Sequence, residues 1–370
     1  KTGSSSVGAE VARTHSGALS ANDELYNALF QRLNVIRVHS VAAFDETLKM
    51  LTTTSAPKGR RVAMLTNSGG EKALAADTAK DTVLEFAPPS PSTAASLADQ
   101  MPPFASVSNP LDYNDYYPGS GPDVLSPDNP HLLVKCFKTL VDDHYNIVVM
   151  LMGFRVFPDG RVHERCATFD AWIEAVTGSG KSAVLASVLP EHLPLAQRQK
   201  LIAHDIAPLQ GLDECVNAID AVVRWHENKQ ALGQRLLPSP RLVADAGRLL
   251  NEFDSKSALR AFGVVFPSFE RCLPGAATER AHDIGYPVVL KALDPLLPHK
   301  AKAGAVALCL KDKHEVEQAL HSIKRSLLKQ GLELREVLVE AMVLGGQREL
   351  FLGVNYSNRF GHSLVFGLGG

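Results

Sequence analysis

The sequence has no basic excess, no long apolar run and few cysteines, and each of these absences narrows the possible functions. It contains 38 lysines and arginines against 40 aspartates and glutamates, which gives a formal net charge of −2. Proteins that bind nucleic acids or membrane surfaces usually carry a basic excess, so we expect neither kind of partner. No run approaches the ~18 apolar residues of a membrane-spanning helix, and no signal peptide is visible.

The cysteines are scattered and form no recognisable set. No two of them have metal-ligand spacing, and an odd number argues against a disulfide framework. Reduced structural thiols in a cytoplasmic protein are therefore the expected state. The five positions are Cys136, Cys166, Cys215, Cys272 and Cys309.

The length and the two ends predict part of a longer, multidomain polypeptide. The sequence begins at Lys1 without a methionine and ends in a glycine loop after Phe366–Leu368. Its 370 residues exceed the roughly 250–300 residues over which a single hydrophobic core grows. We therefore expect two or three domains, with incomplete domains at the two ends.

Residues 58–228 alternate apolar strand-like runs with helical segments. Alternation of this kind predicts a doubly wound parallel α/β sheet with right-handed crossovers. Asn146–Met152 is nearly all apolar, as a central strand buried on both faces should be. We expect a flavodoxin-like strand order. The predicted strands are 61–66, 83–86, 146–152, 183–188 and 206–209, and the predicted helices are about 70–82, 163–176, 192–204 and 212–230.

Other regions flank this domain on both sides. Residues 1–57 hold a small-residue loop and two amphipathic helical stretches, from Asn22 and near 43–52, which is less than a complete domain. Residues 229–250 are polar and contain two prolines, and they predict an interdomain linker. Residues 251–370 have an α+β pattern, with helices at 255–262 and 313–329 and strands at 287–292, 306–310, 337–342, 349–355 and 363–367.

The first candidate for chemistry is His15, in the run Arg13–Leu19. It stands among small residues with glycines on both sides, and such a loop can bring backbone N–H groups close to an anion. A neutral imidazole is available near pH 7 and is a competent nucleophile. A surface-loop histidine without function is the alternative interpretation.

Two further motifs lie in the α/β domain. Thr66–Gly70 follows a buried strand and opens a helix, where free N–H groups and the helix dipole can bind a phosphoryl group without a lysine. The alternative is a tight turn that needs glycine for its backbone angles. Asn109–Asp112 has a turn signal in Asn-Pro, with Asp112 placed to orient the loop, and a purely structural turn is again the alternative.

A fourth series of residues lies in the last region. Lys291 ends a predicted strand, His299-Lys300 and Gly304 follow in a loop, and Glu340 lies on a later strand. Lysine neutralises phosphate as a point charge, so this order is typical of a nucleotide site. A lone lysine after a strand is usually a solvated end, but the full series in this order is more specific.

Taken together, these motifs resemble the ADP-forming acetate–CoA ligase family, acyl-CoA synthetases related to succinyl-CoA synthetase. Lys1–Leu19 is similar to the family's phosphohistidine loop, K-x-G-x-S-x-x-G…S-H-T-G-A, with the hydroxyl residues Thr14 and Ser16 exchanged around His15. Thr66–Gly70 is similar to the T-N-x-G-G turn of the next domain, and Asn109–Asp112 to its N-P-x-D motif. Residues 255–370 look like the start of the ATP-grasp region, so the resemblance covers essentially the whole chain.

The resemblance implies a domain order. Residues 1–57 would be the C-terminal part of a succinyl-CoA-synthetase-like flavodoxin domain that carries the phosphohistidine loop. Residues 58–228 would be a second flavodoxin-like CoA-ligase domain, and 229–250 the linker. Residues 251–370 would be the N-terminal part of an ATP-grasp domain.

The resemblance also implies an activity. Acyl-CoA and phosphate would form an acyl phosphate, His15 would take its phosphoryl group, and ADP would accept it, with ATP driving thioester formation in reverse. Ser68, Gly69 and Gly70 would bind the phosphoryl group, and His299 would be a second relay histidine. Lys291 and Gly304 would bind nucleotide phosphates, Glu340 the base or ribose, and Mg²⁺ would bridge the phosphates.

The sequence departs from the family pattern in three places. Ala305 stands where a second glycine is usual, and its methyl group predicts weaker nucleotide binding by this loop. The CoA-binding Rossmann domain and the acidic residue that supports the active histidine would precede Lys1. The metal-binding carboxylates of the ATP-grasp fold would follow Gly370, so we expect this chain alone to be inactive.

Three other functions stay open at this point. One is a ligase-like regulatory region of a protein lysine acetyltransferase, although such proteins often lose the histidine that is retained here at position 15. The others are a non-catalytic CoA- or nucleotide-binding protein and an unrelated flavodoxin-like enzyme. The residues do not reveal which carboxylic acid is activated or whether ADP or GDP is used. A homodimer is expected, because such ligases are commonly assembled from paired halves.

Overall fold

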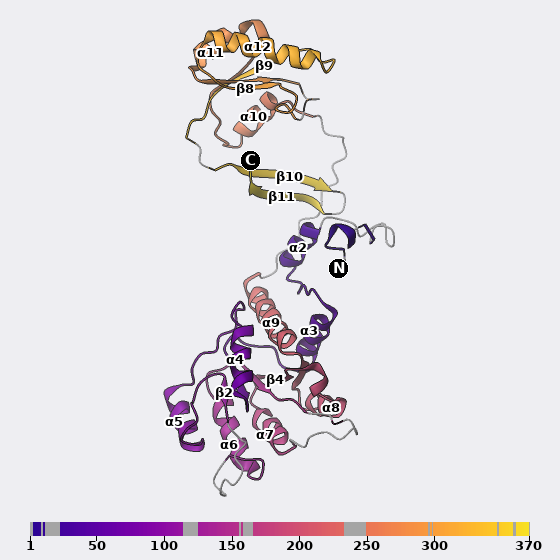
Figure 1. The fold of residues 1–370 in the computed structure, drawn as a ribbon, viewed down its shortest axis with the longest axis vertical. Coiled ribbons are helices and arrows are strands. Elements are labelled where there is room, and N and C mark those ends of the chain that lie inside the picture. The colour runs from indigo at the N-terminus through magenta and orange to yellow at the C-terminus, as the bar shows by residue number, and fades with distance from the viewer. Residues whose placement is uncertain are drawn as a thin grey trace. The chain divides into compact units, whose positions relative to one another are not determined.

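The computed structural model describes residues 3–8, 10–11, 23–113, 125–154, 157, 166–232, 249–294, 297, 299–345, 348–357 and 360–369. Contacts along the chain divide it into two units, Lys1–Leu237 and Pro238–Gly370 (Figure 1). Across these described residues, no helix has both the length and the apolar character needed to cross a membrane.

The first unit is built on a parallel sheet of five strands in the order β2-β1-β3-β4-β5. This is the flavodoxin-like order, so the predicted topology is confirmed. Every residue of β1, β3 and β4 is buried, because strands covered on both faces need continuous apolar runs. The strands are β1 (Val62–Thr66), β2 (Leu111–Asp112), β3 (Ile147–Leu151), β4 (Ser182–Ser187) and β5 (Ala207–Gln210).

Helices cover both faces of this sheet and enclose two hydrophobic cores (Figure 1). One core contains residues of α5 to α8 and centres on Trp172, whose ring meets Phe137 edge-on at 6.3 Å. The other contains residues of α3, α4 and α9. The helices are α2 (Asp23–Arg32), α3 (Val41–Thr53), α4 (Gly69–Thr78), α5 (Pro91–Gln100), α6 (Pro130–Val141), α7 (Cys166–Val176), α8 (Leu195–Ile202) and α9 (Leu212–Leu232), with a short 3-10 helix at Pro190–His192.

Helix α3 is tied to the end of the sheet by polar contacts. The buried Glu46 carboxylate accepts a hydrogen bond from the Gln210 backbone N–H at 3.0 Å, and Lys49 Nζ donates to the Pro208 carbonyl at 3.2 Å. At the end of the helix, Thr54 Oγ1 accepts from the Ala183 N–H at 2.9 Å. Although α3 falls within residues 1–57, its contacts are with α9 and with β4 and β5 of the neighbouring sheet.

Two expectations for this unit need correction. The strand predicted at 83–86 is reduced to a single parallel bridge between Glu85 and Arg61. Helices α5 and α6 were not predicted at all. Both begin with a proline in the first turn, after Ser90 and Asn129 respectively, which is a helix-start signal that the sequence contained.

The second unit has an antiparallel sheet of four strands in the order β6-β9-β7-β8. Helices α11 and α12 cover one face, and α10 packs against the other, where the Phe253 and Phe269 rings are 5.6 Å apart (Figure 1). A hairpin of β10 and β11 follows. The elements are α10 (Glu252–Arg260), β6 (Phe269–Cys272), a 3-10 turn (Pro274–Ala276), α11 (Ala277–Ile284), β7 (Val288–Ala292), β8 (Val306–Leu310), α12 (Lys313–Leu328), β9 (Val337–Ala341), β10 (Leu350–Ser357) and β11 (Gly361–Leu368).

Candidate functional site

The turn between β1 and α4 lies at the carboxyl end of the central strands, where open α/β sheets bind ligands. Ser68 is the N-cap of α4, and its Oγ accepts a hydrogen bond from the Glu71 N–H at 3.3 Å. Thr66 Oγ1 donates to Glu71 Oε2 at 2.8 Å and accepts from the Ser68 N–H at 3.2 Å. Gly69 and Gly70 form the first turn, whose N–H groups have no intrahelical partner and suit an anion.

A pocket of about 530 Å³ lies beside this turn and includes Gly69, Lys72 and Asp112 in its wall. A Cβ on Gly69 would stand 3.7 Å from Asp112 Oδ2, so the structure brings the two predicted motifs together. Lys72 is a cation that the sequence analysis missed, and its Nζ donates to Ser108 Oγ at 2.5 Å. Its place in the first turn after the two glycines was the available signal.

Asn109 of the N-P-x-D motif has a structural role. Its Oδ1 accepts from the Met64 N–H at 3.0 Å, and its Nδ2 donates to the carbonyls of Val62 and Ala87 at 2.6 and 2.9 Å. One side chain thus fastens β1 to two neighbouring segments. The other polar side chain of the motif, Asp112, reaches the β1–α4 turn.

We expect Ser68→Ala to lower the free energy of unfolding of the first unit by about 1 kcal/mol, because it removes the cap on the Glu71 N–H. Both tryptophans of the chain, Trp172 and Trp225, lie in this unit, so their fluorescence during denaturant unfolding reports on it. Ser68→Asp is the matched control, because aspartate keeps the cap. Equal destabilisation by the two substitutions would show that the cap is not the cause.

In the second unit, five charged side chains from three elements and one loop form a connected cluster. Lys291 Nζ of β7 donates to Glu252 Oε1 at 2.7 Å and to Glu340 Oε2 at 2.9 Å. Lys300 Nζ donates to Glu252 Oε2 at 2.7 Å. Lys256 lies 3.2 Å from Glu252 and also pairs with Glu340. The structure therefore joins the predicted Lys291 and Glu340, and it adds Glu252, Lys256 and Lys300.

These contacts change the protonation of the cluster. Burial alone would raise the pKa of Glu252, but hydrogen bonds and positive charge from Lys291 and Lys300 lower that pKa to about 2. Burial likewise opposes the charged form of Lys291, but Glu252 and Glu340 raise the pKa of this lysine above its ordinary value. Both groups are therefore ionised at neutral pH.

The low pKa of Glu252 predicts that acid loosens the second unit. The paired carboxylate contributes stability above its ordinary pKa of 4.5, and this contribution is lost as pH falls toward the folded-state pKa of about 2. We expect hydrogen exchange in β7 and β9, after correction for intrinsic rates, to speed up over this range. In Glu252→Gln this part of the pH dependence should be absent. Glu333→Gln, whose side chain is 78% exposed, is the control, and equal pH profiles for both variants would contradict the assignment.

The loop that carries His299 is an exposed helical turn. His299 is exposed, and its carbonyl accepts from the Ala303 N–H at 3.1 Å. Gly304 ends the turn with a φ of 65°, and a Cβ there would stand 2.9 Å from Ser326 Oγ, so glycine is required by the backbone and by packing. The Ala305 methyl is fully buried in the core, so it does not project into this loop.

His15 lies outside the described residues, so its surroundings are a matter of prediction. Among the residues that the structure does describe, no group of three His, Cys, Asp or Glu side chains could hold a metal ion. The donor set of the cluster in the second unit, with three lysines, suits phosphate rather than a cation.

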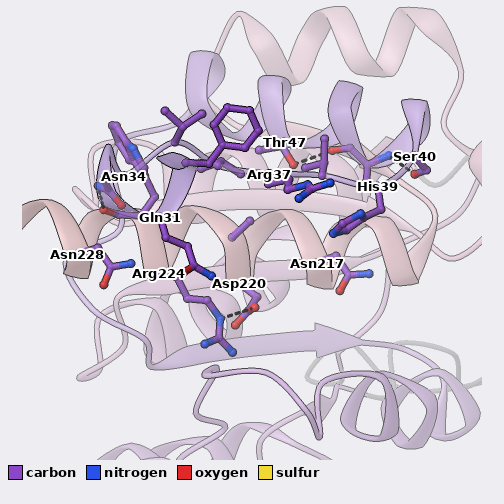
Figure 2. Close-up of a pocket in the computed structure, with 17 residues that line it drawn as sticks. Gln31, Asn34, Arg37, His39, Ser40, Thr47, Asn217, Asp220, Arg224 and Asn228 are labelled. Carbon is purple, nitrogen blue, oxygen red and sulfur yellow. Dashed lines mark hydrogen bonds and ion pairs between the residues drawn. The ribbon is translucent and has the colours of Figure 1, made fainter. Parts of the chain in front are cut away.

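Another pocket, of about 540 Å³, lies between the α2–α3 segment and α9 (Figure 2). Both of its arginines and one of its amide side chains already have partners. Arg37 pairs with Asp23 at 2.7 Å, Arg224 with Asp220 at 2.8 Å, and Asn34 donates to the Trp225 carbonyl at 2.8 Å. None of the predicted site residues lines it.

Comparison with known proteins agrees with this architecture. Residues 241–370 match the ATP-grasp domain, and residues 1–51 match the succinyl-CoA ligase like flavodoxin domain. The 4-hydroxybutyrate–CoA ligase (ADP-forming) of Nitrosopumilus maritimus is 23% identical over 393 positions, which cover 100% of this chain and 52% of that protein. The acetate–CoA ligase (ADP-forming) I of Archaeoglobus fulgidus is 28% identical over 388 positions, with 100% and 52% coverage.

Among solved structures, the acetyl-coenzyme A synthetase 1 of Ca. Korarchaeum cryptofilum, in complex with phosphate and ADP, has the same fold. The TM-score is 0.50 at 19% identity, over 62% of this chain and 47% of that one. Fold and matches together define a chain with a flavodoxin-like CoA-ligase part and an ATP-grasp part. The chain is similar along its entire length to proteins named as ADP-forming CoA ligases, and it spans about half the length of those proteins.

Proposed function

We propose that this chain supplies the phosphohistidine, a phosphoryl-binding turn and the nucleotide lysines of an ADP-forming acid–CoA ligase. One observation carries the proposal. A chain matched along its whole length by ADP-forming CoA ligases holds both a capped helix N-terminus at Ser68–Gly70 and a lysine cluster around Lys291. These are the two kinds of phosphate site that a phosphoryl shuttle requires.

The proposed reaction runs in three steps. Phosphate attacks the thioester carbonyl of acyl-CoA, the C–S bond breaks, and acyl phosphate and CoA form. An imidazole nitrogen of His15 then attacks phosphorus, and the bond to the acyl oxygen breaks to release the carboxylic acid. In the third step the phosphoryl group passes from His15 to His299 and from there to an oxygen of the ADP terminal phosphate, which frees both imidazoles. The reverse sequence uses ATP to make the thioester.

The turn at Ser68–Gly70 stabilises the phosphoryl group during the first two steps. Its backbone N–H groups are fixed in direction by the Ser68 cap, so they do not reorganise when charge develops. Lys72 adds a positive charge at the same pocket. The Gly69 and Gly70 positions carry no side chain, which lets a phosphorylated imidazole approach the backbone closely.

The nucleotide is bound in the second unit. Lys291 and Lys300 neutralise the phosphates of the nucleotide. Gly304 ends the turn that carries Lys300. Glu340, at the end of β9, binds the base or ribose. His299, exposed on the same loop, acts as a second relay histidine. Mg²⁺, when bound with the nucleotide, supplies charge neutralisation between its phosphates.

The substrates follow from the same chemistry, whereas the location and the assembly are the ones expected from the sequence. The substrates are a carboxylic acid, CoA and ATP or ADP, and the protein works in the cytoplasm as a homodimer. We propose four parts along the chain. The phosphohistidine loop lies in residues 1–57 and the second CoA-ligase sheet in 58–228. The linker is 229–250, and the ATP-grasp region is 251–370.

Incubation of the full-length protein with ATP labelled at the γ-phosphate tests the proposal. We expect a protein-bound label that is labile in acid and stable in base, as a phosphoramidate is, and that is discharged by ADP. Peptide mapping should place the label on His15. A protein that makes acyl-CoA from ATP without ever carrying such a label would contradict the proposed mechanism.

A further inference from the structure

Glu252 of α10 forms ion pairs with both lysines that the proposed nucleotide site needs. Its two carboxylate oxygens each lie 2.7 Å from an ammonium group, Oε1 from Lys291 Nζ and Oε2 from Lys300 Nζ. A carboxylate that spans two lysines in this way uses its oxygens as a phosphate would. The lysine side chains are 21% and 17% exposed. A phosphate that arrives from solvent therefore competes with Glu252 for the same donors.

The other carboxylate of the cluster is held more rigidly. Glu340 lies on β9, which pairs with β6 on one side and β7 on the other, and its side chain is 8% exposed. Moving its backbone would break two strand ladders, and its side chain is enclosed by its neighbours. Glu252 instead lies on a nine-residue helix that has no buried residue. Of the two carboxylates, Glu252 is the one that can leave.

The charge of the cluster favours such an exchange. Three lysines and two glutamates leave one uncompensated positive charge while Glu252 is in place. Without Glu252, the three lysines face Glu340 alone, and the excess positive charge doubles. The negative charge of a di- or triphosphate complements that excess positive charge. Lys256 lies 3.2 Å from Glu252, the carboxylate that the phosphate would replace.

We propose that Glu252 is an internal phosphate mimic, which fills the phosphate subsite of Lys291 and Lys300 in the free protein and is displaced when a nucleotide binds. Lys256 is the third cation of the same subsite. This inference rests on the proposed function and adds to it a built-in competitor. A nucleotide binds only those molecules in which Glu252 has left, so the competitor lowers the apparent affinity.

Calorimetric titration of the full-length protein with ATP, ADP and AMP in the presence of Mg²⁺ tests the inference. Glu252→Gln keeps the size of the side chain and removes its charge. We expect ATP to bind roughly fivefold to tenfold more tightly to this variant than to the wild type, with a smaller gain for AMP. If Glu252 only positioned the lysines, the substitution would weaken binding, so the sign of the change separates the two roles.

Asp254→Asn is the matched control, because it removes the same charge from the same helix. The partner of Asp254 is Arg271, at 3.8 Å, rather than a lysine of the cluster. We expect its ATP affinity to stay within about twofold of the wild type, since the charge acts only at a distance. An equal gain in both variants would reduce the effect to net charge and overturn the inference.

The remaining outcomes are also decisive. If the wild type binds ATP and Glu252→Gln binds it equally or more weakly, the inference fails and the proposed function stands. If neither binds ATP, the proposed nucleotide site fails and the inference fails with it. Should Glu252→Gln not fold, Glu252→Asp replaces it, because the shorter carboxylate can span at most one lysine. Tighter ATP binding by Glu252→Asp supports the inference, and unchanged or weaker binding overturns it.

Discussion

Replacing His15 by alanine is expected to abolish the label that γ-labelled ATP places at residue 15 of the full-length protein, with acyl-CoA formation reduced at least about a thousandfold. The reason is chemical, because no other atom at that position can hold the phosphoryl group between the two half-reactions. Binding of CoA should be nearly unchanged, since the substitution removes a nucleophile and not a binding surface. Both quantities are measured on purified protein, as incorporated label and as equilibrium binding.

A second histidine provides the control for this experiment. His204 is exposed at the end of α8, and His204→Ala removes the same ring from the same unit. We expect it to label and turn over like the wild type. If His15→Ala kept wild-type turnover, the shuttle would have to run through another residue and the assignment of His15 would be wrong.

Lys291→Gln is expected to weaken nucleotide binding about a hundredfold, or about 2.7 kcal/mol. The substitution removes a charge-assisted donor to phosphate, and glutamine cannot replace the ammonium charge. It also leaves Glu340, 8% exposed, with Lys256 as its remaining ion-pair partner among the described residues. We therefore expect a second effect, a loss of roughly 1–3 kcal/mol in the stability of the second unit. Calorimetric titration with ATP and hydrogen exchange in β7 and β9 measure the two effects separately.

Lys302→Gln is the matched control for Lys291→Gln. Lys302 is exposed, two residues beyond Lys300, and no ion pair is found for it among the described side chains. It has the same charge and nearly the same position, so a nonspecific electrostatic effect would appear in both variants. Equal nucleotide affinities for the two variants would remove Lys291 from the proposed site.

The fold of the first unit could be predicted because its central strands are buried on both faces. Continuous apolar runs such as Ile147–Leu151 leave few alternatives, and their alternation with helices selects a parallel sheet. The omitted helix α5 is rich in alanine and serine and buries Leu97 as its single fully covered residue. Its apolar pattern is therefore weak, and its start signal at Ser90-Pro91 was the stronger clue.

The candidate site was predicted only in part, for a different physical reason. Lys291 and Glu340 lie on strands whose order along the chain matches a known pattern, so sequence alone could select them. Glu252 is 39 residues from Lys291 in sequence and lies on an amphipathic helix where charged residues are expected on the solvent side. The packing of Phe253 on Phe269 helps to turn that helix so that Glu252 and Lys256 face the sheet, and this tertiary contact is not visible in the sequence.

The position of α3 determines where the chain can be divided for independent expression of the flavodoxin-like unit. A polypeptide that started at residue 58 would lose the buried carboxylate that holds the Gln210 amide, and it would uncover the core below Met50, which is 1% exposed. A polypeptide that started at Ser40 would retain this helix together with the hydroxyl group that accepts from the Ala43 N–H at its beginning. The self-sufficient folding boundary therefore lies before this helix and not in the polar stretch after it.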